Sequence, residues 1–201
     1  MALADELAPL LGADSMNVAW HHFPDGESLL TLPPDLAERD VGLLATLQDP
    51  DRVALPLRFA AETAREFGSN SVGLIAPYLA YMRQDKRFHP GEAVSAPLFA
   101  AFLEESFDWL VTVDPHLHRN PDLSQLFDIP AVHVATAPII ADWIKDNIPD
   151  AVLLGPDSES QQWVGEVAKL ASRPYEVLRK SRRGDRTVDI SVPKKNAMHA
   201  G

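Results

Sequence analysis

Short apolar runs alternate along the chain with longer segments in which apolar residues recur at helical spacing. The apolar runs predict strands at 17–23, 28–32, 41–46, 72–76, 109–113, 129–134, 151–154 and 175–179. Helical spacing predicts helices at 2–11, 49–67, 93–106, 138–148 and 160–171, with Pro56 kinking the second helix or marking its start. Because strands alternate with helices, the pattern indicates an α/β fold with mostly parallel sheets.

Polar clusters follow several of these runs. FPDGE (23–27) places an aromatic ring and two carboxylates around Gly26, and a simple turn or hairpin also explains Asp25-Gly26. RQDKRFH (83–89) follows the run that ends at Ala76. Open α/β sheets bind ligands beyond the carboxyl ends of their strands, where Arg and Lys suit phosphate and Gln suits a base edge. The alternative interpretation is a solvated surface loop.

Two further clusters lie later in the chain. VTVDPHLH (111–118) carries Asp114, His116 and His118, which suit a divalent metal or its phosphates, or form an ordinary loop with surface histidines. Between 153 and 160 the sequence places Asp157, Ser158 and Ser160, and these hydroxyls either cap a helix or help its N-terminus hold a phosphate. Together, the clusters indicate a site for a magnesium nucleotide or a sugar phosphate.

Composition narrows the function classes. The net charge of −11 argues against wide contact with nucleic acid, although a local basic cluster can still bind a small anion. The chain has no cysteine, which excludes disulfides, zinc–thiolate sites and cysteine nucleophiles. The N-terminus is unlike a signal peptide, and no run approaches the roughly 20 apolar residues of a membrane span. We therefore expect a cytoplasmic protein that binds neither nucleic acid nor membrane.

In their order along the chain, these motifs resemble the ribose-phosphate pyrophosphokinases, also called phosphoribosyl-diphosphate synthetases. The resemblance runs from about Val18 to Pro193 and is most specific in RQDKRF-x-PGE-x-S. The matching segments are FPDGE, PYLAYMRQDKRFHPGEAVSA, VTVDPHLH, FDIPAVHVATAPIIADWI, GPDSESQQWV and RKSRRGDR.

The resemblance implies two tandem phosphoribosyltransferase-type domains, at 1–136 and, incompletely, at 137–201. It implies transfer of the diphosphoryl group of ATP to the 1-hydroxyl of ribose 5-phosphate, which gives phosphoribosyl diphosphate and AMP for nucleotide biosynthesis. It also implies dependence on Mg²⁺ and a homo-oligomer built from dimers, with the ATP site at a subunit interface.

The resemblance assigns the ATP site to two segments. Phe23, Asp25 and Glu27 correspond to a loop that a neighbouring subunit contributes on the adenine side. The ATP-binding segment corresponds to Arg83, Gln84 and Asp85.

The catalytic and metal-binding roles fall on residues further along the chain. His116 corresponds to a catalytic histidine near the metal and the ATP phosphates, with Asp114 beside it. Asp157 corresponds to an aspartate near ribose 5-phosphate and its metal. Lys180 and Arg182 correspond to a basic pair on a mobile catalytic loop, where two cations can neutralise charge on the transferred group.

The sequence departs from the family pattern at both ends. The family begins with a strand before the helix at 2–11, and its phosphoribosyl-binding loop should follow 189–193, where this sequence reads KKNAMHAG. We therefore expect a chain truncated at both ends. A non-catalytic or truncated relative that binds nucleotide or a partner subunit is the alternative. A phosphoribosyltransferase would need the same loop and lacks RQDKRF.

Overall fold

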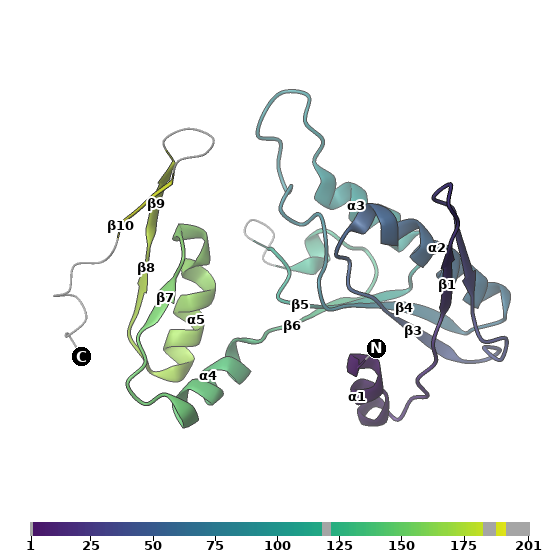
Figure 1. Cartoon of the computed structure of the whole chain (residues 1–201), viewed down its shortest axis with the longest axis horizontal. Helices are drawn as coiled ribbons and strands as arrows, with labels where there is room; N and C mark the ends of the chain where they lie inside the picture. The colour runs from purple at the N-terminus through teal and green to yellow at the C-terminus, as the bar shows by residue number, and fades with distance from the viewer. Residues whose placement is uncertain (1, 118–121, 183–187, 192–201) are drawn as a thin grey trace. The chain divides into compact units, whose positions relative to one another are not determined.

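The computed structural model describes residues 2–117, 122–182 and 188–191 (Figure 1). The chain forms two compact units, Met1–Val134 and Ala135–Gly201. The domain division expected after residue 136 stays a prediction, because a compact segment need not fold independently.

The first unit is built on a parallel sheet of four strands in chain order. The strands are β3 (Asp40–Leu44), β4 (Ser71–Ala76), β5 (Trp109–Val113) and β6 (Ala131–Val134). Helix α2 (Pro50–Glu66) connects β3 to β4, helix α3 (Ser95–Glu104) connects β4 to β5, and a 3₁₀ turn at Leu123–Gln125 precedes β6. These connections confirm the α/β prediction.

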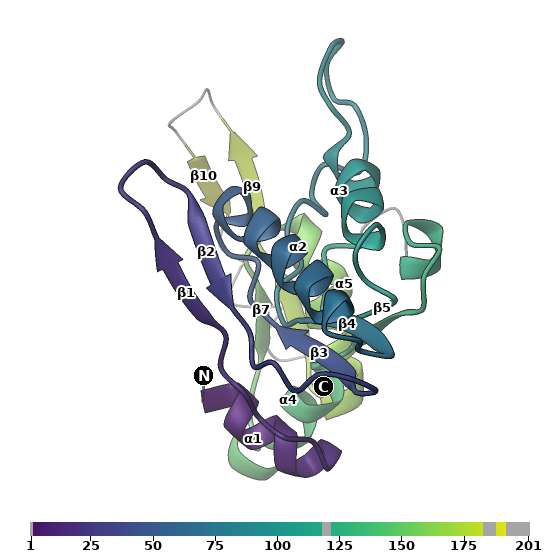
Figure 2. The same ribbon diagram turned by 90° about the vertical axis from the view of Figure 1, so that its right-hand side faces the viewer.

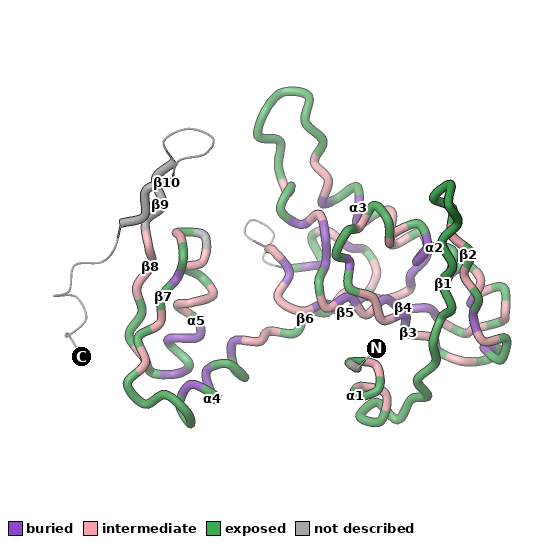
Figure 3. Tube along the Cα trace, viewed as in Figure 1, coloured by how far each residue is buried: buried purple, intermediate pink, exposed green. Residues whose placement is uncertain are grey.

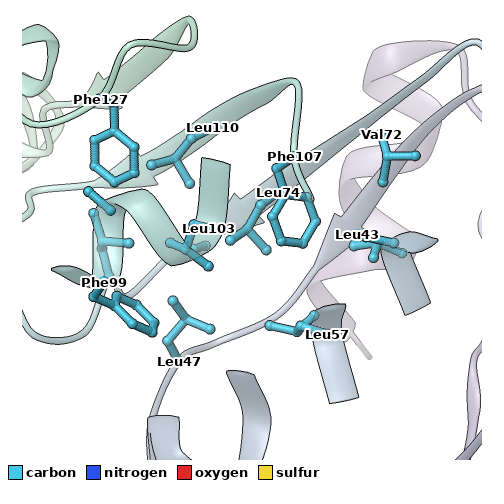
Figure 4. Close-up of a cluster of buried hydrophobic side chains, with 14 of the residues drawn as sticks. Leu43, Leu47, Leu57, Val72, Leu74, Phe99, Leu103, Phe107, Leu110 and Phe127 are labelled. Carbon is cyan, nitrogen blue, oxygen red and sulfur yellow. The ribbon is translucent and has the colours of Figure 1, made fainter. Parts of the chain in front are cut away.

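Both helices pack against one face of this sheet, as two views of the chain show (Figures 1 and 2). Leu43, Leu74 and Leu110 are paired across neighbouring strands and point into this core (Figure 4). Successive residues of a strand face opposite sides, so one register fixes the whole buried row. Small buried residues of α2, such as Ala61, allow the helix to lie close to the sheet.

Helix α2 excludes one of the two interpretations of Pro56, whereas the kink stays a prediction. The helix begins at Pro50, where a missing N–H group costs nothing because the first helical N–H groups have no partner within the helix. Pro56 lies inside the helix and is buried. It therefore does not mark the start of the helix.

The N-terminal part of this unit carries helix α1 (Ala2–Leu11) and an antiparallel hairpin. The hairpin consists of β1 (Ala19–His22) and β2 (Ser28–Thr31), and every residue of β1 is exposed (Figure 3). The turn predicted at Asp25-Gly26 is confirmed, because these residues connect the two strands.

The second unit contains a two-stranded parallel sheet and an antiparallel hairpin. Strands β7 (Leu153–Gly155) and β8 (Tyr175–Val177) are joined through helix α5 (Gln161–Ala171), which packs on α4 (Ala137–Asn147). Strands β9 (Arg179–Arg182) and β10 (Val188–Ser191) form the hairpin. The strand expected at 175–179 therefore ends at Val177. Within the described ranges, no helix is long and apolar enough to cross a membrane.

Candidate functional site

Two of the predicted clusters leave the sheet at the same edge. Ala76 at the end of β4 is paired with Thr112 near the end of β5. Because the strands are parallel, the segments that follow them start from neighbouring positions. The connection that carries RQDKRFH and the segment with Asp114 and His116 therefore both start at the carboxyl edge of the sheet.

The segment between β4 and α3 extends away from the sheet as a long loop (Figures 1 and 2). Its base is fixed at Tyr81, a non-glycine residue with φ of 65°. The Tyr81 hydroxyl donates a hydrogen bond to Asp51 in the first turn of α2, and the ring lies 4.8 Å from that of Phe99. The hydrogen bond to Asp51, together with partial burial, raises the pKa of the Tyr81 phenol.

Gln84 is held by both its backbone and its side chain. Its N–H donates to the carbonyl of Tyr81 at 3.3 Å, and its carbonyl accepts from the N–H of Ala96 at 3.2 Å. Its Oε1 accepts from the Ser95 hydroxyl at 2.6 Å, so the amide Nε2–H groups are the part that can donate to a ligand. The adjacent Arg83 is exposed, and Asp85 is half-buried. The predicted ATP-binding segment is therefore anchored to the start of α3.

An open groove of about 430 Å³ lies between α2 and α3 beside this anchor. Apolar groups such as Leu55 and Leu98 dominate its lining, to which Tyr81 and Ser95 also contribute. None of the predicted site residues lines this groove.

FPDGE forms the tip of the β1–β2 hairpin. The Phe23 N–H donates to the carbonyl of Glu27 at 2.9 Å, and the Glu27 N–H donates to Asp25 Oδ1 at 3.1 Å. Gly26 has φ of 95°, a backbone conformation that favours glycine. All these residues are exposed, and the Asp25 carboxylate stabilises the turn itself. Their contribution to an ATP site stays a prediction.

VTVDPHLH begins within β5 and continues past its end. The Asp114 N–H donates to the carbonyl of Val134 on β6 at 3.2 Å, which keeps this turn at the edge of the sheet. Asp114 and His116 are half-buried, and His118 lies outside the described residues. In the part of the chain that the structure describes, no three His, Asp or Glu side chains gather as a metal cage. A magnesium ion that keeps several waters and binds mainly through phosphates needs no such cage.

Asp157 and the Lys180/Arg182 pair belong to the second unit. Asp157 caps the 3₁₀ turn Ser158–Ser160 that leads into α5, with Oδ1 accepting from the Ser160 N–H at 3.0 Å. Capping is thus observed at this 3₁₀ turn, where Asp157 and Ser160 form a capping box, whereas the Ser160 side chain makes no cap hydrogen bond to α5. The backbones of Lys180 and Arg182 lie in β9, paired with Ile190 and Val188. The structure describes only the backbone of these two residues.

Three residues that hold the loop were not among the candidates from the sequence. All three lie within the quoted motif: Tyr81 acts through Asp51 of α2, and Glu92 and Ser95 act through residues of the irregular segment itself. Such contacts follow no helix or strand period, so only the motif itself could have marked these residues.

The geometry defines an open α/β protein with polar residues at the carboxyl ends of its strands. Similarity to known proteins identifies the family within this class. Residues 1–106 match the N-terminal domain of ribose phosphate pyrophosphokinase. The ribose-phosphate pyrophosphokinase of Methanopyrus kandleri is 34% identical over 190 residues, which cover 94% of this chain and 64% of that protein. That of Saccharolobus solfataricus is 34% identical over 187 residues, covering 91% and 62%. The chain belongs to the ribose-phosphate pyrophosphokinase family.

A solved structure supports the fold. The phosphoribosylpyrophosphate synthetase from Mycobacterium smegmatis superimposes with a TM-score of 0.79 at 22% identity, over 95% of this chain and 63% of that one. The chain thus spans less than two thirds of the length of these relatives. The predicted family and the predicted α/β fold class are both confirmed.

Proposed function

We propose that this protein transfers the diphosphoryl group of magnesium ATP to the 1-hydroxyl of ribose 5-phosphate, forming phosphoribosyl diphosphate and AMP. Its relatives are named for this activity. The observation that carries the proposal is the anchored Arg83–Gln84 segment, which leaves the carboxyl edge of β4 and is tied to Ser95 and Ala96. An exposed guanidinium beside a fixed amide suits a nucleotide, since the first binds phosphate and the second a base edge.

In this proposal, Arg83, Gln84 and Asp85 bind ATP within one subunit. The exposed hairpin tip with Phe23 and Asp25 reaches the adenine side of the site in another copy, together with Glu27. A homo-oligomer built from dimers, acting in the cytoplasm, is part of the same proposal. The exposure of every residue of β1 supports the oligomer, because an exposed strand is available to pair with a partner.

Magnesium is the proposed cofactor, with His116 and Asp157 as the residues near it. The donor types fit only in part. A carboxylate is an ordinary magnesium ligand, whereas an imidazole suits softer metals and would act better through a bound water or a phosphate. When bound, the ion would neutralise charge on the ATP phosphates.

Lys180 and Arg182 supply the remaining positive charge in the proposal. Phosphoryl transfer spreads negative charge over the oxygens of the transferred group, so cations placed beside it lower the barrier. Asp157 is proposed to contact ribose 5-phosphate.

The test is AMP formation from ATP by the pure, folded chain. We expect AMP that depends on both ribose 5-phosphate and Mg²⁺, and a lower rate for Arg83→Ala. Arg39→Ala is the matched control, because Arg39 directly precedes β3, at the opposite end of the strands, and pairs with Asp14. No AMP above background would refute the proposal for this chain. Calorimetry with magnesium ATP then separates loss of binding from loss of turnover.

A further inference from the structure

The outer arm of the long loop, residues 86–92, closes on a single carboxylate. Glu92 Oε2 accepts from the N–H of Phe88 at 3.1 Å and from the N–H of His89 at 2.9 Å. Its Oε1 lies 2.6 Å from Nδ1 of the His89 ring. Gly91, with φ of 89°, brings the chain back so that this side chain reaches the earlier residues.

Two further contacts hold the cationic residues of the arm. Arg87 Nε donates to the backbone carbonyl of Glu92 at 2.8 Å, and Lys86 Nζ lies 4.9 Å from the centre of the Phe88 ring. Glu92 holds the backbone of Phe88, and Phe88 carries the ring beside Lys86. Both cations are exposed, as is most of the arm (Figure 3). The Glu92 carboxylate therefore bears on Lys86 through Phe88, and on Arg87 through the fold of the arm that brings the Glu92 carbonyl within reach.

We propose that Glu92 is a positioning residue that pre-forms the outer arm, so that Lys86 and Arg87 face the phosphates of the nucleotide. This inference rests on the proposed ATP-binding function. Pre-forming an exposed loop strengthens binding because the loop's ordering entropy is lost on folding and not on association.

The sign of the effect distinguishes positioning from simple charge. Glu92 is an anion within a basic loop. If it acted only through its charge, removing it would strengthen the binding of an anionic ligand. If it positions the arm, removing it weakens binding instead. The two roles therefore predict opposite changes for the same substitution.

The experiment measures the dissociation constant of magnesium ATP by calorimetry for the full chain and its variants. We expect Glu92→Ala to weaken binding about tenfold and Glu92→Gln, which keeps a carbonyl acceptor, about threefold. Glu62→Gln removes an exposed carboxylate from α2 and should bind as the unmodified chain does. NMR should show the amide protons of Phe88 and His89 shifting in Glu92→Ala, with the unfolding temperature unchanged.

Two results would overturn the inference. They differ in whether the proposed ATP-binding function survives. If both Glu92 variants bind magnesium ATP as tightly as the unmodified chain, or more tightly, while Arg83→Ala weakens binding, positioning by Glu92 is wrong and the nucleotide site stands. If the unmodified chain binds no magnesium ATP, the proposed function fails for this chain, and the role of Glu92 fails with it.

Discussion

The indole of Trp109 on β5 lies directly against Gly73, its partner on β4. A Cβ atom added at Gly73 would stand 1.9 Å from Trp109 Cε2, far inside van der Waals contact. The glycine therefore provides the space in which a large aromatic ring lies flat on the sheet, on the face opposite the row of leucines.

Gly73→Ala should destabilise the first unit by about 1–3 kcal/mol, because either the ring or the strand must move. Gly42→Ala is the matched control. Gly42 lies on β3 and is paired with Gly73 of β4. A Cβ atom added at Gly42 would meet Ile75 Cδ1 at 3.3 Å, a contact that a small side-chain shift relieves. Denaturant unfolding measures both. Equal stability of the two variants would contradict the prediction, and Gly73→Ala should cost less in a Trp109→Ala background than in the unmodified chain.

Asp108 connects three elements at the amino-terminal edge of the sheet. Its Oδ2 accepts from the N–H of Val72 at 2.7 Å, and its Oδ1 accepts from Arg65 of α2 at 2.9 Å. Partial burial raises the pKa of Asp108, but the hydrogen bonds from Arg65 and Val72 outweigh this effect and leave the pKa below its ordinary value. The charged form is thus favoured in the folded chain.

Asp108→Asn should lower the free energy of unfolding at neutral pH by about 1 kcal/mol, because an amide cannot accept from both donors. The value is modest because the side chain is 42% exposed and screened by solvent. A carboxyl with a lowered pKa stabilises the fold above its unfolded pKa of about 3.9, and this contribution is lost as the pH falls through the folded value. The difference between the variant and the unmodified chain should therefore shrink in acid. A difference that stays constant down to strongly acidic pH would contradict the assignment, and Glu66→Gln on α2 is the control.

The central strands could be predicted from the sequence because their own residues determine where each strand lies. Uninterrupted apolar runs at 72–76 and 109–113 have few alternatives to a buried strand, and the structure places β4 and β5 there. In the second unit, the boundary between strands β8 and β9 depends on which strand each pairs with. The N–H of Leu178 still donates to Gly155, and from Arg179 onward the chain pairs with β10, a change of partner that no local pattern records.

The candidate site shows the same division. Polar residues at strand ends were visible because parallel strands gather their ends at one edge, as Arg83 and Asp114 illustrate. The supporting contacts were not visible. Ser95 reaches Gln84 across 11 positions of irregular chain, and that spacing has no periodic signature.

Asp157 offers a way to separate capping from ligand binding. Asp157→Ala should destabilise the second unit by up to about 1 kcal/mol, because the Ser160 N–H loses its side-chain acceptor and keeps only the Asp157 carbonyl at 3.1 Å. Asp157→Ser keeps a good capping residue and should retain most of that stability, yet it lacks a carboxylate for a metal or sugar phosphate. If Asp157 serves only as a cap, the serine variant should retain both the unfolding temperature and the affinity for ribose 5-phosphate. If Asp157 also binds ligand, the affinity for ribose 5-phosphate should fall while the unfolding temperature is retained.

Ser95→Ala tests whether the orientation of Gln84 matters to nucleotide binding. The Ser95 hydroxyl fixes Oε1 and so directs the amide Nε2–H groups, whereas the backbone bond from Ala96 survives the substitution. We expect about threefold weaker binding of magnesium ATP and a reduced preference for ATP over GTP, since a freely turning amide reads a base edge less selectively. Ser95→Thr keeps the hydroxyl and should restore both, and Ser15→Ala near α1 serves as an exposed control. If Ser95→Ala binds ATP and GTP as the unmodified chain does, Gln84 does not contact the base.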